Sequence, residues 1–306
     1  AMKFFTASIE KAGMNPDKIS LENLPDESIT WLADDAKEKS PATEKIYLIA
    51  ASRFFAFLSA NDLKDVNLSR IQLLVQQNSR KQGERLPQFP SSEIDTLINK
   101  MMAMENYPEE DIWLQLRYYR DRALIVTLAD TGMRIHEACK ILRENVNWNE
   151  NFGIVIGKGN KEAVIRFSDR AIRILRDYHT VCERNIKIKP GHGDYAKLIG
   201  KRPLFYSHDI RSRNRDSPIT PTTGRNIVDQ RAREFLGENA ASTITPHSFR
   251  HYFVTRILRS SNNLKLAQEL ARHKNIAVTQ RYAHISNEEL DRGFHEAMQD
   301  SPTPKK

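Results

Sequence analysis

The sequence is poor in cysteine and has no long apolar run. Its two cysteines, Cys139 and Cys182, do not form a CxxC pair, and two thiols are too few for a disulfide framework, so we expect a reducing compartment. Residues 2–5 do not begin a long apolar segment, and no run approaches the roughly 20 residues of a membrane-spanning helix. We therefore predict no signal peptide, no membrane association and a cytoplasmic location.

Charge is unevenly distributed along the 306 residues. Residues 1–86 carry 12 Lys or Arg and 12 Asp or Glu, whereas residues 134–306 carry 31 basic and 19 acidic side chains. The length allows two domains, and a basic domain beside a balanced one favours a polyanionic partner, most simply nucleic acid. Charge alone leaves open an ordinary solvated basic surface or binding to an anionic membrane surface.

Apolar spacing predicts a small helical domain in the first part of the chain. One helix begins at Ser40-Pro41, an N-cap followed by proline. Its predicted core stripe consists of Ile46, Ala50, Phe54 and Phe57, widened by Ile49 and Leu58. A second helix is predicted around Leu68 to Val75. Residues 80–90 contain Gly83, Pro87 and Pro90, which predicts an interdomain linker.

The residues after the linker predict three further helices. The first is capped by Ser91 or Ser92. The second, over 119–130, is strongly apolar and ends before Gly132, which suits the left-handed position after a helix. The third runs over 137–142.

The periodicity changes to that of strands at Gly153. Residues 153–167 predict a hairpin whose turn is 157–161, G-K-G-N-K. A helix follows over 168–184, and a basic helix is predicted over 222–236. Between them, the long polar stretch 186–220 contains one piece that resembles a strand, 203–206.

A cationic cluster is predicted on a helix that starts at Thr245-Pro246. The order T-P-H-S-F-R-H puts His247, Arg250 and His251 on one helical face, beside apolar residues. Such a cluster needs an anionic partner, and we predict a phosphate. An exposed basic helix face is the plain alternative. A zinc pair of His247 and His251 is a weaker one, because Ser248 stands where a metalloprotease has glutamate.

The order of these residues resembles the tyrosine recombinase family, which includes phage integrases and Xer-type resolvases. The resemblance covers nearly the whole chain and rests on five pieces in family order. They are Arg134 after T-G-M, Lys158 in the hairpin turn, His247-x-x-Arg250, His273, and Tyr282 in T-Q-R-Y-A-H. Each piece alone is weak, but the set at family spacing is specific.

The resemblance implies a mainly α fold with a small β-sheet. A helical core-binding domain (1–86) and an α+β catalytic domain (87–306) would clamp duplex DNA. A C-terminal helix over 287–298 would dock in cis or on a neighbouring subunit. The implied assembly is a homo-oligomer on DNA, a dimer at each site and a tetramer in synapsis, located at the nucleoid. An accessory protein is compatible with it.

The implied reaction is strand cleavage through a covalent phosphotyrosine. Tyr282 would attack a backbone phosphorus, although a phenol with a pKa near 10 is a poor nucleophile at neutral pH. Arg134 and Arg250 suit the negative charge of the transition state, because a guanidinium donates in a planar fork. Fixed cations of this kind are worth ~3–4 kcal/mol each.

The remaining predicted site residues handle protons and orientation. His247 accepts the phenolic proton or donates to the phosphate, and Lys158 protonates the leaving 5′ oxygen. His273 donates to the phosphate. Glu137 orients Arg134, and Lys161 is an alternative to Lys158. The scheme uses no cofactor, no metal ion and no ATP.

Other activities remain open at this stage. A type IB topoisomerase shares the phosphotyrosine chemistry, and a DNA-binding regulator could keep the fold without turnover. The sequence departs from many relatives at Ala271-Arg272, where they have glycine before the histidine, a change we expect to leave His273 undisturbed. The length of 186–220 keeps a mobile-element integrase and a chromosome-dimer resolvase equally open.

Overall fold

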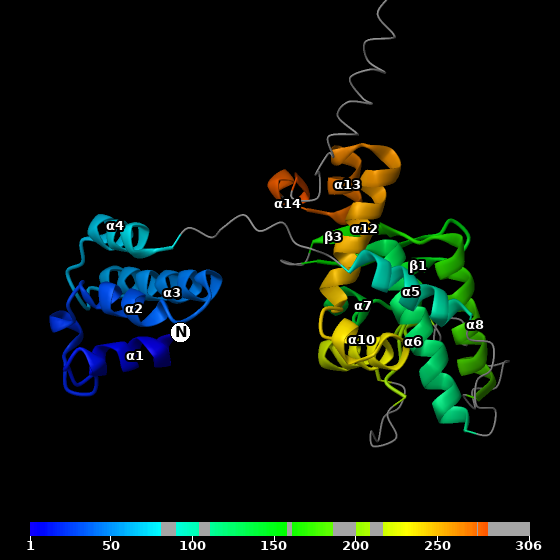
Figure 1. Ribbon diagram of the computed structural model, residues 1–306, viewed down its shortest axis with the longest axis horizontal. Coiled ribbons are helices and arrows are strands. Elements are labelled where there is room, and N and C mark those ends of the chain that lie inside the picture. Colours follow the sequence, from blue (N-terminus) through cyan, green and yellow to red (C-terminus); the bar gives the residue numbers. More distant parts are fainter. Residues whose placement is uncertain are drawn as a thin grey trace, which may run out of the picture. The chain divides into compact units, whose positions relative to one another are not determined.

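The computed structural model describes residues 1–80, 90–103, 111–157, 161–185, 200–208, 217–273 and 275–280. These residues are mainly helical, with one three-stranded antiparallel sheet, as predicted. The chain divides into two compact units, Ala1–Leu86 and Pro87–Lys306, and Figure 1 shows each of them. The predicted linker lies largely outside the described residues. Within the described ranges, no helix is both long and apolar enough to cross a membrane.

The first unit is a small helical bundle. Its elements are α1 (Met2–Lys11), the 3-10 helix η1 (Leu21–Asn23), α2 (Ser28–Ala36), α3 (Pro41–Ala60) and α4 (Leu68–Asn78). The predicted start of α3 is confirmed, because the Ser40 side chain accepts a hydrogen bond from the backbone N–H of Thr43. Helix α1 was not predicted, although it packs against both α2 and α3.

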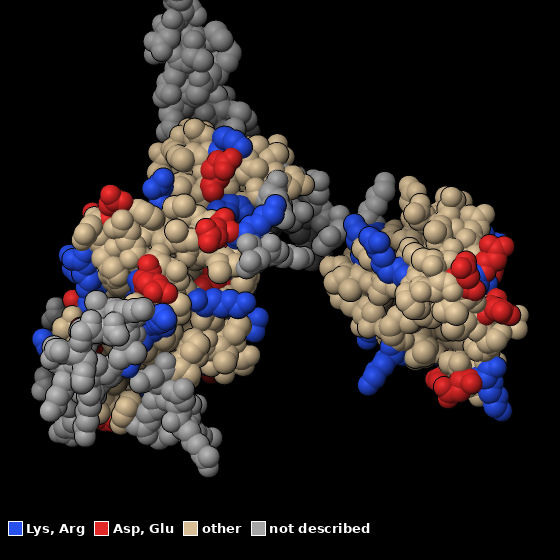
Figure 2. All heavy atoms as spheres, turned by 180° about the vertical axis from the view of Figure 1, so that it is seen from behind, with Lys and Arg blue, Asp and Glu red and all other residues tan. Residues whose placement is uncertain are grey.

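The predicted buried stripe of α3 is wrong except for Leu58. The helix buries Leu48, Ala51, Phe55 and Leu58, together with Glu44. Ile46 and Phe57 are instead 62% and 55% exposed. The helix is apolar around most of its circumference, so sequence periodicity does not identify the face that packs on α1 and α2. On the face of this unit seen in Figure 2, a broad uncharged area lies between basic and acidic side chains.

The second unit combines helices with the sheet. Its elements are α5 (Ser91–Met102), α6 (Ile112–Thr131), α7 (Ile135–Ala138), η2 (Arg143–Asn145), β1 (Val146–Asn147), β2 (Phe152–Ile156), β3 (Glu162–Arg166), α8 (Asp169–Asn185), α10 (Pro221–Leu236), α11 (Glu238–Ala241), α12 (Pro246–Ser261), α13 (Leu264–Ala271) and α14 (Ile276–Gln280). The strands pair in the order β1-β2-β3, which confirms the predicted hairpin. The predicted strand 203–206 contributes only two isolated bridges among the described residues.

Helix α6 organises the core of this unit. It packs against α8 and α12, and most of its second half is buried on every side. It also carries a buried ionic network that ties it to α10. Asp121 accepts from Arg120 Nε and Arg231 Nε, both at 2.9 Å, and all three residues are at most 4% exposed. The Asp121–Arg231 pair links α6 to α10, and separating the two helices would break this buried ion pair.

Three predicted helix boundaries need correction. Helix α5 has Pro90 at its N-cap and no side-chain cap, so neither serine caps it. Helix α6 begins at Ile112 after an Asp111 cap, about two turns earlier than predicted. Helix α7 ends at Ala138 instead of residue 142, because the chain turns there to bridge Leu142 with Pro203 and to enter β1.

Candidate active site

The junction between α6 and α7 presents Arg134. Gly132 ends α6 in the left-handed region with φ +59°, as predicted, and a β-carbon there would lie 2.5 Å from the Phe253 ring. Arg134 then starts α7. Its backbone N–H and its Nη1 donate to the two carboxylate oxygens of Glu137, at 2.9 and 3.0 Å. Glu137 is 2% exposed and Arg134 is 40% exposed, so a buried anion holds a cation that reaches the surface.

Helix α12 positions Arg250. The predicted cap is confirmed, with Thr245 accepting from the backbone of Ser248 and proline at the first turn. Arg250 is 3% exposed, and its Nη1 donates to the carbonyl of Gly132 at 2.7 Å. Its Nη2 donates to the carbonyl of Ala271. One guanidinium therefore joins the end of α6 to the end of α13.

His273 lies directly beside Arg250. It follows the end of α13 and lies outside any helix. Its Nε2 accepts from Arg250 Nε at 3.3 Å, so Nδ1 carries the proton and donates to Thr279 Oγ1 at 2.9 Å. This tautomer is inferred from the hydrogen bonds. Thr279, which is fully buried, had no signal in the sequence analysis beyond its place between His273 and Tyr282.

A further guanidinium, Arg272, was not predicted as part of the site. Its Nη2 donates to Glu137 Oε2 at 2.9 Å, and its side chain is 12% exposed. Glu137 is thus shared by Arg134 and Arg272. Its carboxyl pKa lies below the ordinary value because attraction from Arg272 and Arg134, with the hydrogen bonds from Arg134, outweighs its burial. The only sequence signal for Arg272 was its departure from glycine beside His273.

The electrostatics of this cluster are those of an anion site. Burial, followed by repulsion from Arg134 and Arg272, lowers the pKa of Arg250 to about 9. Burial and the guanidiniums, Arg250 foremost, lower the pKa of His273 to about 4, and burial and Arg250 also lower the pKa of His247. Glu137 pairs with two guanidiniums, Arg250 has no carboxylate contact of its own among the described residues, and His273 is neutral at pH 7. A phosphate diester would supply the missing negative charge and accept the remaining N–H donors.

The other predicted residues fall in three groups. Lys158 and Tyr282 lie outside the described residues. Lys161 is exposed at the base of the hairpin turn, where its carbonyl accepts from Gly157. The rings of His247 and His251 lie 4.2 Å apart and perpendicular. The described part of the chain holds no group of three His, Cys, Asp or Glu residues able to bind a metal ion.

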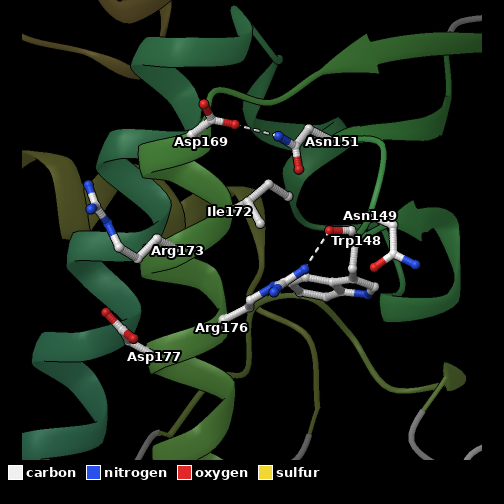
Figure 3. A pocket seen from close by; sticks show the side chains of 8 residues that line it. All are labelled: Trp148, Asn149, Asn151, Asp169, Ile172, Arg173, Arg176 and Asp177. Carbon is white, nitrogen blue, oxygen red and sulfur yellow. Dashed lines mark hydrogen bonds between the residues drawn. The ribbon is translucent and has the colours of Figure 1, made fainter.

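A separate pocket of about 440 Å³ lies between the turn after β1 and helix α8 (Figure 3). Its polar groups are largely paired with one another. Arg176 Nη2 donates to the carbonyl of Trp148 at 2.5 Å, and Asn151 Nδ2 donates to Asp169 Oδ1 at 2.6 Å. It shares no residue with the arginine cluster, and we assign it no part in the site.

Comparison with known proteins agrees with this geometry. Residues 92–289 match the phage integrase family. The chain is 28% identical over 200 residues to tyrosine recombinase XerD of Staphylococcus saprophyticus, covering 65% of this chain and 60% of that protein. It is 26% identical over 267 residues to tyrosine recombinase XerC of Pediococcus pentosaceus, covering 87% of this chain and 78% of that protein.

Among solved structures, the fold is similar to the XerH site-specific recombinase bound to a palindromic difH substrate in a post-cleavage complex. The TM-score is 0.65 at 19% identity, over 97% of this chain and 80% of that one. The fold is thus that of the tyrosine recombinases. The family match spans more than half of the residues, so the chain belongs to the phage integrase family of tyrosine recombinases.

Proposed function

We propose that this protein is a site-specific DNA recombinase that cuts and rejoins duplex DNA through a 3′-phosphotyrosine intermediate. The observation that carries the proposal is the guanidinium of Arg250, buried between two backbone carbonyls and hydrogen-bonded to His273. A cation held this rigidly requires an anion of fixed position. Membership of the phage integrase family makes a DNA phosphodiester the natural anion.

In the proposed strand cleavage, His247 and Lys158 account for both proton transfers. The phenol oxygen of Tyr282 attacks the scissile phosphorus, and its proton passes to His247. The bond from phosphorus to the 5′ oxygen breaks, and Lys158 protonates the departing oxygen. The product is a 3′-phosphotyrosine and a free 5′ hydroxyl. Attack by another 5′ hydroxyl reverses these steps, so rejoining needs no ATP.

The described residues have defined tasks in this scheme. Arg134 and Arg250 donate to the non-bridging oxygens as their charge grows. Of the five N–H groups of Arg250, three are engaged by described residues, which leaves two for the phosphate. His273 accepts from Arg250 in the absence of DNA, so it must gain a proton or turn before it can donate to the phosphate. Glu137 fixes Arg134, and Lys161 remains the alternative to Lys158.

The proposal extends to the assembly. Residues 1–86 serve as the core-binding domain and residues 87–306 as the catalytic domain, and the two clamp duplex DNA. The active species is a homo-oligomer, a dimer on each site and a tetramer when two sites pair. It acts in the cytoplasm on DNA of the nucleoid. The helix predicted from sequence at 287–298, which lies outside the described residues, is the proposed contact between subunits.

A plasmid recombination assay tests the proposal. Two copies of the DNA flanking the gene are placed on one supercoiled plasmid and incubated with the protein in EDTA. We expect deletion or inversion between the copies, and no product from Tyr282→Phe. The matched control is Tyr47→Phe, a half-buried tyrosine of the first unit, which should retain full activity.

Three other results would contradict the proposal. Relaxation of any plasmid without recombination would identify a type IB topoisomerase. Salt-sensitive binding without strand cleavage would identify a DNA-binding regulator. Loss of activity in EDTA would identify metal-dependent chemistry.

A further inference from the structure

Arg272 occupies a backbone conformation that disfavours its own side chain. It follows α13 with φ +57° and ψ +44°, in the left-handed region that glycine adopts freely and residues with a β-carbon do not. An arginine in this conformation lowers the stability of the folded protein relative to a glycine. Such outliers persist where the surrounding structure holds them in place.

The side chain of Arg272 is also under-satisfied. Its Nη2 donates to Glu137, but Nε and Nη1 are buried without a hydrogen-bond partner among the described residues. Burial, only partly offset by the attraction of Glu137, lowers its pKa, and repulsion from Arg134 adds to the effect. A guanidinium with unpaired donors, next to two like charges, destabilises the free protein. Stability therefore does not explain why it is there.

Arg272 contacts Glu137, the same carboxylate that holds Arg134. Glu137 Oε2 accepts both the backbone N–H of Arg134 and Nη2 of Arg272, each at 2.9 Å. Glu137 is 2% exposed and has no freedom to follow one partner away from the other. The start of α7 is thus linked through one carboxylate to the residue that ends α13.

The two residues that flank Arg272 in the chain, Ala271 and His273, both contact Arg250. The carbonyl of Ala271 accepts from Arg250, and His273 accepts from the same guanidinium. Residues 271–273 therefore contact Arg250 directly and reach Arg134 through Glu137. Displacing this segment would move His273, and through Glu137 it would also move Arg134.

We propose that Arg272 is a positioning residue, which fixes Arg134 through Glu137 and fixes His273 through the backbone at the end of α13. Sharing Glu137 between two guanidiniums also leaves more of the positive charge of Arg134 available to the phosphate. The inference rests on the proposed function, since the geometry it sets is that of the scissile phosphodiester.

The variant Arg272→Gly removes the side chain and suits the left-handed backbone, so it should fold. We expect its melting temperature to stay within about 4 °C of the wild type. Its matched control is Asn262→Gly, which makes the same change at the exposed left-handed end of α12. Arg272→Lys keeps the charge but donates from a single nitrogen, so it should recover part of the activity.

The first measurement is single-turnover cleavage of a nicked duplex at saturating DNA. We expect Arg272→Gly to cleave on the order of 10- to 100-fold more slowly with unchanged DNA affinity, and Asn262→Gly to match the wild type. The double variant with Glu137→Gln should be no slower than the slower single variant, because both act through one contact. A wild-type rate for Arg272→Gly, or additive losses in the double variant, would overturn the proposal.

The second measurement does not depend on cleavage. The pKa and tautomer of His273 are read from nitrogen chemical shifts of histidine-labelled protein without DNA. Arg272→Gly should raise the pKa of His273, because one repelling cation is gone, and should weaken its Nδ1–H tautomer. An unchanged titration and tautomer would refute the role of Arg272. If the wild type cleaves no DNA, the proposed function fails, while this measurement still decides the role of Arg272.

Discussion

Replacing Arg250 by lysine tests how much of the proposed catalysis depends on guanidinium geometry and how much on charge alone. The Arg250 side chain uses three nitrogens on three acceptors, the carbonyls of Gly132 and Ala271 and Nε2 of His273. An ammonium has one nitrogen and cannot reach acceptors that lie on different sides of a planar fork. The variant keeps the positive charge but loses the orientation.

The expected magnitudes follow from these contacts. Two lost hydrogen bonds to carbonyls reduce the free energy of unfolding by about 2 kcal/mol. Loss of an oriented donor to the transition state costs ~3–4 kcal/mol, which slows cleavage about 10²- to 10³-fold. Arg259→Lys changes an exposed arginine about two and a half turns further along α12; it is the matched control and should change neither quantity.

The assay is single-turnover cleavage at saturating DNA, with thermal unfolding measured in parallel. A cleavage rate for Arg250→Lys within threefold of the wild type would refute the reasoning, since charge alone would then suffice. Slow cleavage that is fully rescued by higher DNA concentration would also refute it, because the contribution of Arg250 would lie in binding.

Three further predictions concern stability. Asp121→Leu removes the buried carboxylate shared by Arg120 and Arg231, leaves Arg120 without its carboxylate, and should lower the free energy of unfolding by about 3–5 kcal/mol in urea, whereas the exposed Asp229→Asn should cost less than about 1 kcal/mol. Gly132→Ala forces a β-carbon into the Phe253 ring at positive φ, and a loss below about 1 kcal/mol would contradict this account. Burial lowers the pKa of His208 to about 3, so the unfolded chain takes up its proton first as the pH falls below 6.5; His208 alone should make unfolding cost about 2 kcal/mol less at pH 5 than at pH 7, and His208→Gln should reduce the pH dependence by that amount.

Several elements could be predicted from sequence because their signals are local. The cap at Thr245 and the end of α6 at Gly132 are each determined by a few neighbouring residues, and both are confirmed. The hairpin between β2 and β3 follows from period-two alternation around a glycine turn. Such signals do not depend on what the element packs against.

The sequence predictions were wrong where contacts between distant parts of the chain determine the structure. Helix α3 has two apolar stripes about half a turn apart, and only contact with α1 and α2 selects the one containing Leu48 and Phe55. The end of α7 depends on the bridge from Leu142 to Pro203, about 60 residues away. Local preference carries no information about either contact.

In the candidate site, too, local signals could be predicted from the sequence and long-range contacts could not. Helical spacing was enough to group His247 with Arg250, and family order suggested Arg134, Glu137 and His273. The backbone carbonyls that fix Arg250 could not be predicted, because every residue has one. The roles assigned to these side chains stay predictions, as do those of Lys158 and Tyr282.

The most direct test of the central claim is a covalent-adduct assay with Tyr282. Nicked duplexes cut from DNA flanking the gene are incubated with the protein in EDTA, and the products are separated on a denaturing gel. Peptide mapping then identifies the linked residue. We predict an adduct at Tyr282 that is absent from Tyr282→Phe. An adduct that survives this substitution, or one attached to another residue, would contradict the account.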